Sequence, residues 1–234
     1  NVSGASAKPF FTHHNALNLD CNLRIATETW LKMVNAAGFD KVFELGKDFR
    51  NEGMDPTHLQ EFTQVEWYAS YWDFEDNIKF FKQFIKELML YVIGTTKITV
   101  AGSVIDFGAD DWERINYVEK MREVLGFDFL SITDANELTD KIVEKKLLTR
   151  AELEDYKSVR AIIDFVYKKF IRANIVGPTI LYNYPAFLKT LARRNDKDDR
   201  ITDVFQVVVN GAEILNAYSE LVTQSSKERR LLVN

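Results

Sequence analysis

The stretch KVFELGKDFRNEGMDPTHLQEFTQVEWYASY, residues 41–71, decides the fold that we expect for this chain. Two runs that mix apolar and aromatic residues with charged ones, 41–50 and 61–71, flank a loop that contains Gly53 and Pro56. Runs of this kind separated by turn-forming residues are typical of strands. The stretch therefore predicts two strands joined by a loop.

Residues outside this stretch predict an α+β fold. Helical spacing of apolar residues predicts helices over 27–37 and 74–93, and most of 112–173 has a helical, more charged pattern. Thr149 and Glu152 have the spacing of a capping box, which predicts that a long helix begins there and runs through Phe170. We expect strands at 10–12, 97–107 and 179–182, and a hairpin over 204–221 that turns at Asn210-Gly211. Strands at both ends with helices between them predict an antiparallel sheet rather than alternating βαβ units.

Alternate residues of a strand point to the same face, so strand positions can be sorted into a front and a back. Each predicted front mixes carboxylates with amides, rings or an arginine, and each predicted back is apolar. One such front is equally well explained as a solvated face, but three of them favour a platform for a ligand. Carboxylates beside aromatic rings suit a ligand that ends in an ammonium group. The front residues are Glu44, Asp48, Arg50, Phe62, Gln64, Glu66, Tyr68, Asn216, Tyr218 and Glu220.

Composition excludes several classes of protein. The 234 residues are enough for one large domain, alone or with an insertion, and 46% of them are hydrophobic. A net charge of −5 argues against a free-standing nucleic-acid-binding protein, although it does not exclude tRNA as a substrate. The single cysteine, Cys21, excludes an internal disulfide framework, and no apolar run is long enough to span a bilayer. We therefore expect a cytoplasmic protein without a membrane partner.

Several motifs in order along the chain resemble those of one family. Residues 50–53 (RNEG), then His58 and residues 61–66 (EFTQVE), resemble motif 2 of the class II aminoacyl-tRNA synthetases. Residues 4–10 (GASAKPF), 23–28 (LRIATE) and 210–221 (NGAEILNAYSEL) resemble segments of the lysyl enzymes. A lone RNEG is a weak signal, whereas this ordered set is specific. The chain is similar to class II lysyl-tRNA synthetases at both ends and in the middle.

The resemblance implies a fold and a set of site residues. Residues 1–234 would be part of the class II catalytic domain, with its antiparallel sheet, flanking helices and a helical insertion at roughly 111–176. Arg50 would be the catalytic residue, because it would bind both the α-phosphate of ATP and the carboxylate of lysine. The family's ATP-binding positions correspond to Arg50, Glu52, His58 and Phe62, and its lysine-binding positions to Gly4, Glu28, Glu66, Tyr68, Asn216, Tyr218 and Glu220.

The resemblance also implies a Mg²⁺ ion, and here the chain departs from the family pattern. Glu213 matches a carboxylate that holds Mg²⁺ against the phosphates. The family has a second carboxylate seven residues earlier, where this chain has Gln206. An amide brings less charge than a carboxylate, so we expect Mg²⁺ binding to be weaker or rearranged.

The function that the resemblance implies is that of a lysine–tRNA ligase. Such an enzyme activates L-lysine with ATP and transfers the lysyl group to the acceptor end of tRNA(Lys). The family is homodimeric, but motif 1, which forms the dimer interface, would precede Asn1, and motif 3 would follow Asn234, so we expect an incomplete segment. Two alternatives stay open: a paralogue that lysylates a protein, and a non-catalytic binding module, which Gln206 favours.

Overall fold

The computed structural model describes residues 7–53, 58–190 and 192–221. The chain divides into two compact units, residues 1–72 and 73–234. Each unit is described by itself below.

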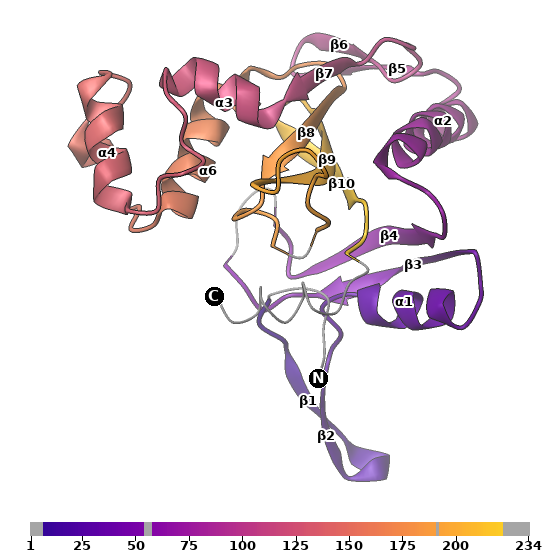
Figure 1. Ribbon diagram of the computed structural model, residues 1–234. Coiled ribbons are helices and arrows are strands. Elements are labelled where there is room, and N and C mark those ends of the chain that lie inside the picture. The colour runs from indigo at the N-terminus through magenta and orange to yellow at the C-terminus, as the bar shows by residue number, and fades with distance from the viewer. Residues whose placement is uncertain (1–6, 54–57, 191, 222–234) are drawn as a thin grey trace. The chain divides into compact units, whose positions relative to one another are not determined.

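The first unit is built on the predicted pair of strands (Figure 1). β3 and β4 pair antiparallel over their whole length, with Glu44 opposite Glu66. A second hairpin, β1–β2, extends from the same unit; the sequence predicted only a strand near its start, because the turn relies on Asn18 with a φ of 47°. The elements are β1 (Phe11–His14), β2 (Leu19–Asn22), α1 (Glu28–Ala36), β3 (Lys41–Phe49) and β4 (Glu61–Ala69), with a short 3₁₀ turn at Asn15–Leu17.

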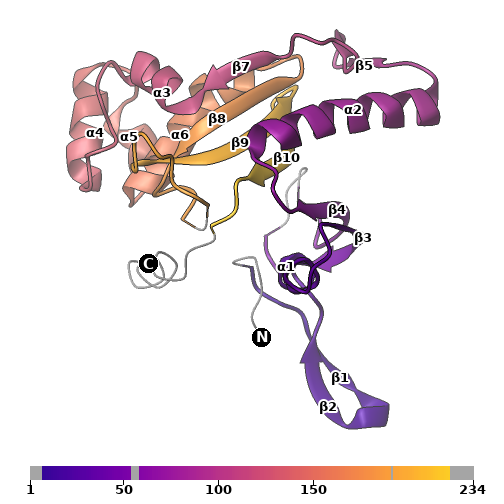
Figure 2. The ribbon, with the colours of Figure 1, turned by 45° about the vertical axis from the view of Figure 1, so that its right-hand side comes forward.

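The second unit is a four-stranded sheet with helices (Figure 2). The strands lie in the order β10-β9-β8-β7, and α2 is the predicted long helix, which begins at an Asp73 capping box and ends at Gly94. The elements are α2 (Phe74–Ile93), β5 (Lys97–Val100), β6 (Ser103–Asp106), β7 (Glu113–Asn116), α3 (Tyr117–Leu125), α4 (Ala135–Glu144), α5 (Arg150–Leu153), α6 (Val159–Phe170), a 3₁₀ turn (Arg172–Asn174), β8 (Thr179–Pro185), β9 (Ile201–Val209) and β10 (Ala212–Tyr218).

Three sequence-based expectations for the second unit were wrong in detail. The segment that reads as helical from residue 112 opens with β7, which pairs parallel with β8, so this sheet is mixed and not purely antiparallel. Residues 97–107 form a hairpin instead of one strand, because Ala101 and Gly102 both adopt positive φ and reverse the chain. The capping box at Thr149 is present, but α5 ends at Leu153, and α6 begins at a separate cap, Ser158.

Both faces of the sheet in the second unit are covered. Val204 and Val208 of β9 belong to a core that also contains Met121, Leu138 and Ile162 from α3, α4 and α6. Alternate residues of β9 point the other way, where Phe205 contacts Phe74 of α2 with 6.4 Å between ring centroids. Cover on both sides explains why eight consecutive residues of β9 are buried and why its second half, residues 204–209, is apolar except for Gln206. Within the described part of the chain, no helix is both long and apolar enough to cross a membrane.

Candidate functional site

The front of β4 in the first unit presents one carboxylate that several neighbours hold in place. Glu66 accepts hydrogen bonds from Thr27 Oγ1 at 2.8 Å, from Gln64 Nε2 at 3.1 Å and from Tyr68 OH at 2.7 Å. A carboxylate offers about four lone-pair positions, so these three donors orient it and leave capacity for a further donor. The structure thus brings together Glu66 and Tyr68, which the sequence assigned to the same face.

Arg50 and Phe62, also predicted to share this front, are in contact. The Arg50 guanidinium lies over the Phe62 ring, 5.1 Å from its centroid, and its Nε donates to the carbonyl oxygen of Ile25 at 3.2 Å. A guanidinium stacked on a ring and tied at one nitrogen keeps its remaining donors in a fixed direction. Such a group binds carboxylate or phosphate oxygens through two parallel hydrogen bonds.

Asp48 lies opposite Phe62 on this front and is fully buried. Burial raises the pKa of its carboxyl, against the opposing effect of Arg24 and Arg50. Arg24 Nε lies 3.2 Å from Asp48 Oδ1, and the same guanidinium also pairs with Glu44. Arg24 crosses β3 at Gly46, where any side chain would collide with it. The charges at the base of the front are therefore paired within the first unit.

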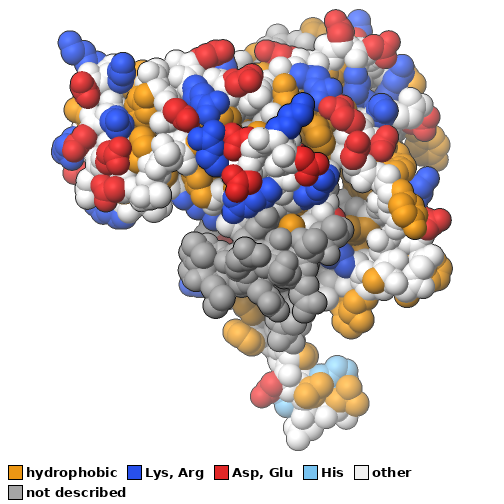
Figure 3. Space-filling model, viewed as in Figure 1, with side chains coloured by type: hydrophobic (Ala, Val, Ile, Leu, Met, Phe, Trp, Pro, Cys, Tyr) orange, Lys and Arg blue, Asp and Glu red, His pale blue; other side chains and the backbone are white. Residues whose placement is uncertain are grey.

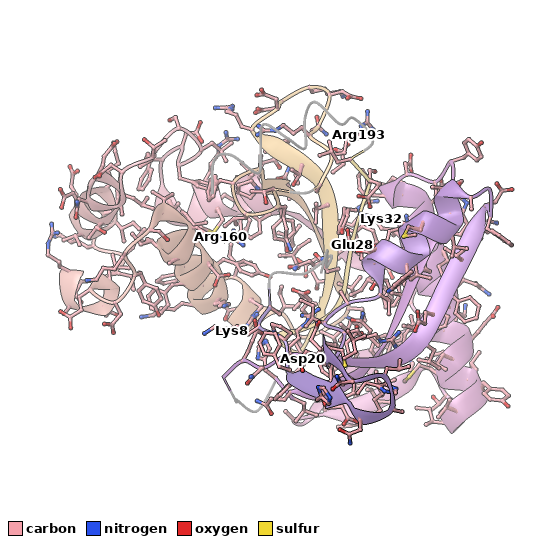
Figure 4. All side chains as sticks on the ribbon, turned by 90° about the horizontal axis from the view of Figure 1, so that it is seen from below. Lys8, Asp20, Glu28, Lys32, Arg160 and Arg193 are labelled. Carbon is pink, nitrogen blue, oxygen red and sulfur yellow. The ribbon has the colours of Figure 1, made fainter. Side chains whose placement is uncertain are left out.

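Glu28 sits at the start of α1, where a carboxylate is favoured by the helix dipole. It forms an ion pair with Lys32 one turn later, and Figure 4 shows the two side by side. The Lys32 ammonium lies 5.6 Å from the centroid of the Tyr68 ring. An ammonium group between a carboxylate and this tyrosine demonstrates that the surroundings of Tyr68 accommodate a cation.

Three other residues of the first unit were predicted to belong to the site. Glu52 and His58 are exposed on either side of the loop between β3 and β4. Gly4 lies outside the described residues.

The second unit holds the other predicted residues, and a β-bulge arranges them. Glu213 lies opposite Val208 and Asn216 opposite Gln206, because the register of β10 against β9 shifts between Glu213 and Leu215. Simple alternation would place Glu213 and Asn216 on opposite faces. The extra residue, Ile214, instead places both on the face of β9 that carries Gln206.

The side chains on this face form a connected hydrogen-bond network. Gln206 Nε2 donates to Glu213 and, at 3.4 Å, to Asn216 Oδ1, while Gln206 Oε1 accepts from the hydroxyl of Tyr184. Lys189 Nζ donates to Asn216 Oδ1 at 3.0 Å. Desolvation raises the pKa of Glu213 and lowers the pKa of Lys189, and the attraction between the two groups opposes both shifts.

Tyr218 and Glu220 follow Asn216 toward the end of β10. Tyr218 lies opposite Val204 and packs against the core of the second unit, and Glu220 forms an isolated bridge with Ala192. Glu66 and Tyr68 belong to the first unit, so the prediction that they share one pocket with Glu220 stays a prediction.

The oxygen atoms around Glu213 are the ones that would have to bind the implied Mg²⁺ ion. Glu213 is the one carboxylate of the network, and the amide oxygens of Gln206 and Asn216 already accept hydrogen bonds from Tyr184, Lys189 and Gln206 itself. Across the residues that the structure describes, no three His, Cys, Asp or Glu side chains are grouped to hold a metal ion. One carboxylate beside two amide oxygens that already accept hydrogen bonds offers too little charge to hold a dication on its own, so these residues do not fit a metal centre formed by the protein alone.

Charge on the surface is mixed. On the face shown in Figure 3, Lys and Arg side chains are interspersed with Asp and Glu over the helices of the second unit.

Comparison with known proteins decides the family. The family model described as tRNA synthetases class II (D, K and N) matches residues 1–234. The chain belongs to this family. The match includes the helical stretch 111–165, in which the sequence motifs offered no support.

Three relatives of this class II synthetase chain carry the name lysine–tRNA ligase. Lysine–tRNA ligase of Clostridium acetobutylicum is 40% identical over 94% of this chain and 42% of that protein. The enzyme of Clostridium botulinum is 39% identical over 99% of the chain and 45% of that protein, and that of Leuconostoc citreum is 40% identical over 94% and 44%. The chain thus spans less than half the length of these relatives.

Sequence reasoning overlooked several residues of the candidate site. Thr27 and Gln64 fix Glu66, although Gln64 had been placed on the front without a role. Tyr184 and Lys189 complete the network around Gln206. Strand alternation pointed to Gln64, whereas no local pattern connects Lys189, which lies outside the strands, to Asn216 of β10.

Proposed function

We propose that the intact protein is a lysine–tRNA ligase that activates L-lysine with ATP and transfers the lysyl group to the 3′ end of tRNA(Lys). The observation that carries this proposal is the orientation of Glu66 by Thr27, Gln64 and Tyr68. A half-buried carboxylate fixed by three donors, with a phenol beside it, is suited to the side-chain ammonium of lysine. The names of the relatives support the same substrate.

In the proposed first step, the carboxylate of lysine attacks the α-phosphorus of ATP. A new bond forms between carboxylate oxygen and phosphorus, the bond to the β-phosphate oxygen breaks, and pyrophosphate leaves. Arg50, held by Phe62 and Ile25, would stabilise the negative charge that develops on the α-phosphate. Because both reactants are anionic, holding them together is a large part of what the site must provide.

In the second step, a hydroxyl of the terminal ribose of tRNA attacks the carbonyl carbon of lysyl-adenylate, AMP leaves with the bonding electrons, and the hydroxyl proton passes to the phosphate of the leaving AMP or to water. Glu66 would select the substrate in both steps, because an amino acid without an ammonium tip would leave a desolvated carboxylate without its partner. Glu220, Asn216 and Tyr218 are proposed to complete the lysine pocket, and Glu52 and His58 to contact ATP. ATP use, the tRNA partner, cytoplasmic location, dimerisation, and the assignment of 1–234 to one catalytic domain remain proposals.

The decisive experiment is amino-acid-dependent exchange between ATP and pyrophosphate, measured on the intact protein with each of the twenty amino acids. We expect exchange with lysine alone, and its loss in Glu66→Gln. Glu61→Gln is the matched control, because Glu61 lies on the same strand but is exposed and pairs with Lys47 at 2.7 Å. Failure of the folded protein to exchange with any amino acid would refute the proposal, and exchange with aspartate or asparagine would overturn the choice of substrate.

A second assay separates the acceptors. Transfer of radiolabelled lysine to tRNA(Lys), compared with transfer to protein, is expected to favour tRNA. Labelling of a protein and not of tRNA would favour the paralogue instead.

A further inference from the structure

The network of Lys189, Asn216, Gln206 and Glu213 contains a cation of its own. Its hydrogen-bond directions are fixed at both ends, because the Glu213 carboxylate only accepts and the Lys189 ammonium only donates. Gln206 must therefore turn its NH₂ to Glu213 and its oxygen to the hydroxyl of Tyr184. Asn216 must likewise turn its oxygen to Lys189. The negative charge of Glu213 is linked through two amides to the positive charge of Lys189.

Lys189 is held in this position by a second contact. Its ammonium lies 5.2 Å from the centroid of the Tyr184 ring, and Tyr184 itself is buried and donates to Gln206. A cation above a ring that is fixed in the core is directed toward the network. The lysine is therefore part of the site and not a freely moving surface residue.

The other charged groups that act on Glu213 come from α6 and the turn after it. Arg172 and Lys168 add positive charge and Asp164 adds negative charge. Lys168 also pairs with Asp164 at 2.6 Å, so these two charges largely offset each other. Lys189 and Arg172 are then the cations that balance Glu213, and of the two only Lys189 bonds to the network.

We propose that Lys189 takes the place of a protein-bound metal ion at Glu213, so that the second unit binds free divalent cations only weakly. Two features of the network support this proposal. An amide at Gln206 removes the second carboxylate that would call for a dication, and an ammonium at Lys189 supplies the charge that one carboxylate needs. The proposal rests on the proposed function in one respect: lysine activation with ATP is the reason to expect a metal ion at Glu213.

The test is Mn²⁺ binding to the intact protein in the absence of nucleotide and amino acid. Binding is measured as the decrease of the electron paramagnetic resonance signal of the free ion. In the wild-type protein we expect no saturable binding that depends on Glu213. The double variant Lys189→Met with Gln206→Glu replaces the ammonium and restores a carboxylate pair. It should bind one Mn²⁺ at least about tenfold more tightly, since the affinity of an oxygen site follows the charge of its ligands.

Matched variants isolate the cause. Lys141→Met also removes an ammonium that lies over a ring, that of Phe127 at 5.8 Å, but away from the network, and should behave as wild type. Lys189→Arg keeps the charge and should also behave as wild type. Adding Glu213→Gln to the double variant should abolish the new site. If the double variant does not fold, as judged by circular dichroism, Lys189→Met and Gln206→Glu are compared separately, each expected to show a smaller gain.

Two results would overturn the proposal. One is stoichiometric Mn²⁺ binding by wild type that Glu213→Gln removes. The other is a folded Lys189→Met, Gln206→Glu protein that binds Mn²⁺ no better than wild type. Because nucleotide and lysine are absent, neither result depends on whether the protein activates lysine.

Discussion

The sheet of the second unit and the β3–β4 pair of the first unit differ in what covers their apolar side chains. In the second unit, Leu181 is inaccessible to solvent and Val208 is equally buried. In the first unit, Phe43 and Leu45 on the back of β3 are 74% and 68% exposed. Both regions have apolar residues at strand positions, yet only those of the second unit's sheet are packed against other elements. Alternation therefore specifies which residues share a face, but it does not specify whether another element covers that face.

The same comparison separates stability from function. Burial of apolar surface stabilises the second unit, which has an extensive core. The described residues of the first unit bury few side chains, and two of these, Thr27 and Asp48, are polar and serve the front. Substitutions of the buried apolar residues of the four-stranded sheet should accordingly affect mainly stability, and substitutions on the front of β3–β4 mainly activity.

The largest effect is expected at Arg50. Arg50→Ala should lower kcat/KM for lysine-dependent pyrophosphate exchange by roughly 10²–10³-fold, which is typical for the loss of a group that stabilises developing charge. Thermal unfolding monitors the fold, and Lys47→Ala in the neighbouring strand β3 is the control, since Lys47 is exposed and pairs with the exposed Glu61. An Arg50→Ala protein with full activity would contradict the assignment of activity to the front of β3–β4.

The next effect contrasts two leucines. Leu181→Ala should lower the free energy of unfolding by about 2–5 kcal/mol, because it leaves a cavity in a packed core. Leu45→Ala should change it by less than about 0.5 kcal/mol, as for other exposed positions. Urea titrations of both variants would measure the difference. Equal losses would mean that the back of β3 is covered in solution.

A smaller effect concerns Asp48. Because the pKa of Asp48 is raised in the folded protein above its ordinary value of 3.8, the folded state binds this proton more tightly than the unfolded state. The free energy of unfolding therefore falls as pH rises above 3.8, and it stops falling once the pH exceeds the pKa of Asp48 in the folded protein. Asp48→Asn should therefore gain stability relative to wild type between pH 4 and pH 7, measured as the midpoint of thermal unfolding. A difference that shrinks with rising pH would show that the pairs with Arg24 and Arg50 outweigh desolvation.

The smallest effect is expected at Glu152 of the second unit, and it has the opposite sign. Lys169 and the backbone and hydroxyl of Thr149 lower the pKa of Glu152 to about 2. Its contribution to stability is present above the ordinary value of 4.5 and is lost as pH falls through about 2. Glu152→Gln should therefore be less stable than wild type at pH 7, with the difference vanishing toward pH 2. A pH-independent difference would exclude charge as the cause.

Much of the front of β3–β4 could be predicted, and the reason is local. Arg50, Phe62, Glu66 and Tyr68 fall on one face because side chains alternate along a strand, and no distant contact is needed to know it. The turn at Asn210-Gly211 was predictable on the same grounds, since both residues adopt the positive φ that they tolerate better than others.

The parts that could not be predicted depend on distant partners. β7 reads as helical from its sequence and becomes a strand because it lies beside β8, more than sixty residues later. The capping box at Thr149 marks where a helix begins, but how far the helix runs depends on the core into which it packs.

By itself, the sequence determined the family, the strand pair within 41–71, the hairpin over 204–221 and the residues that share a strand face, because motifs and alternation are properties of neighbouring residues. The tertiary structure decided that Ile214 bulges, that Glu213 and Asn216 consequently share a face with Gln206, and that Lys189 reaches them. These contacts join β9 and β10 to a segment outside the strands. Register and packing fix them, and neither is encoded in any short stretch of the chain.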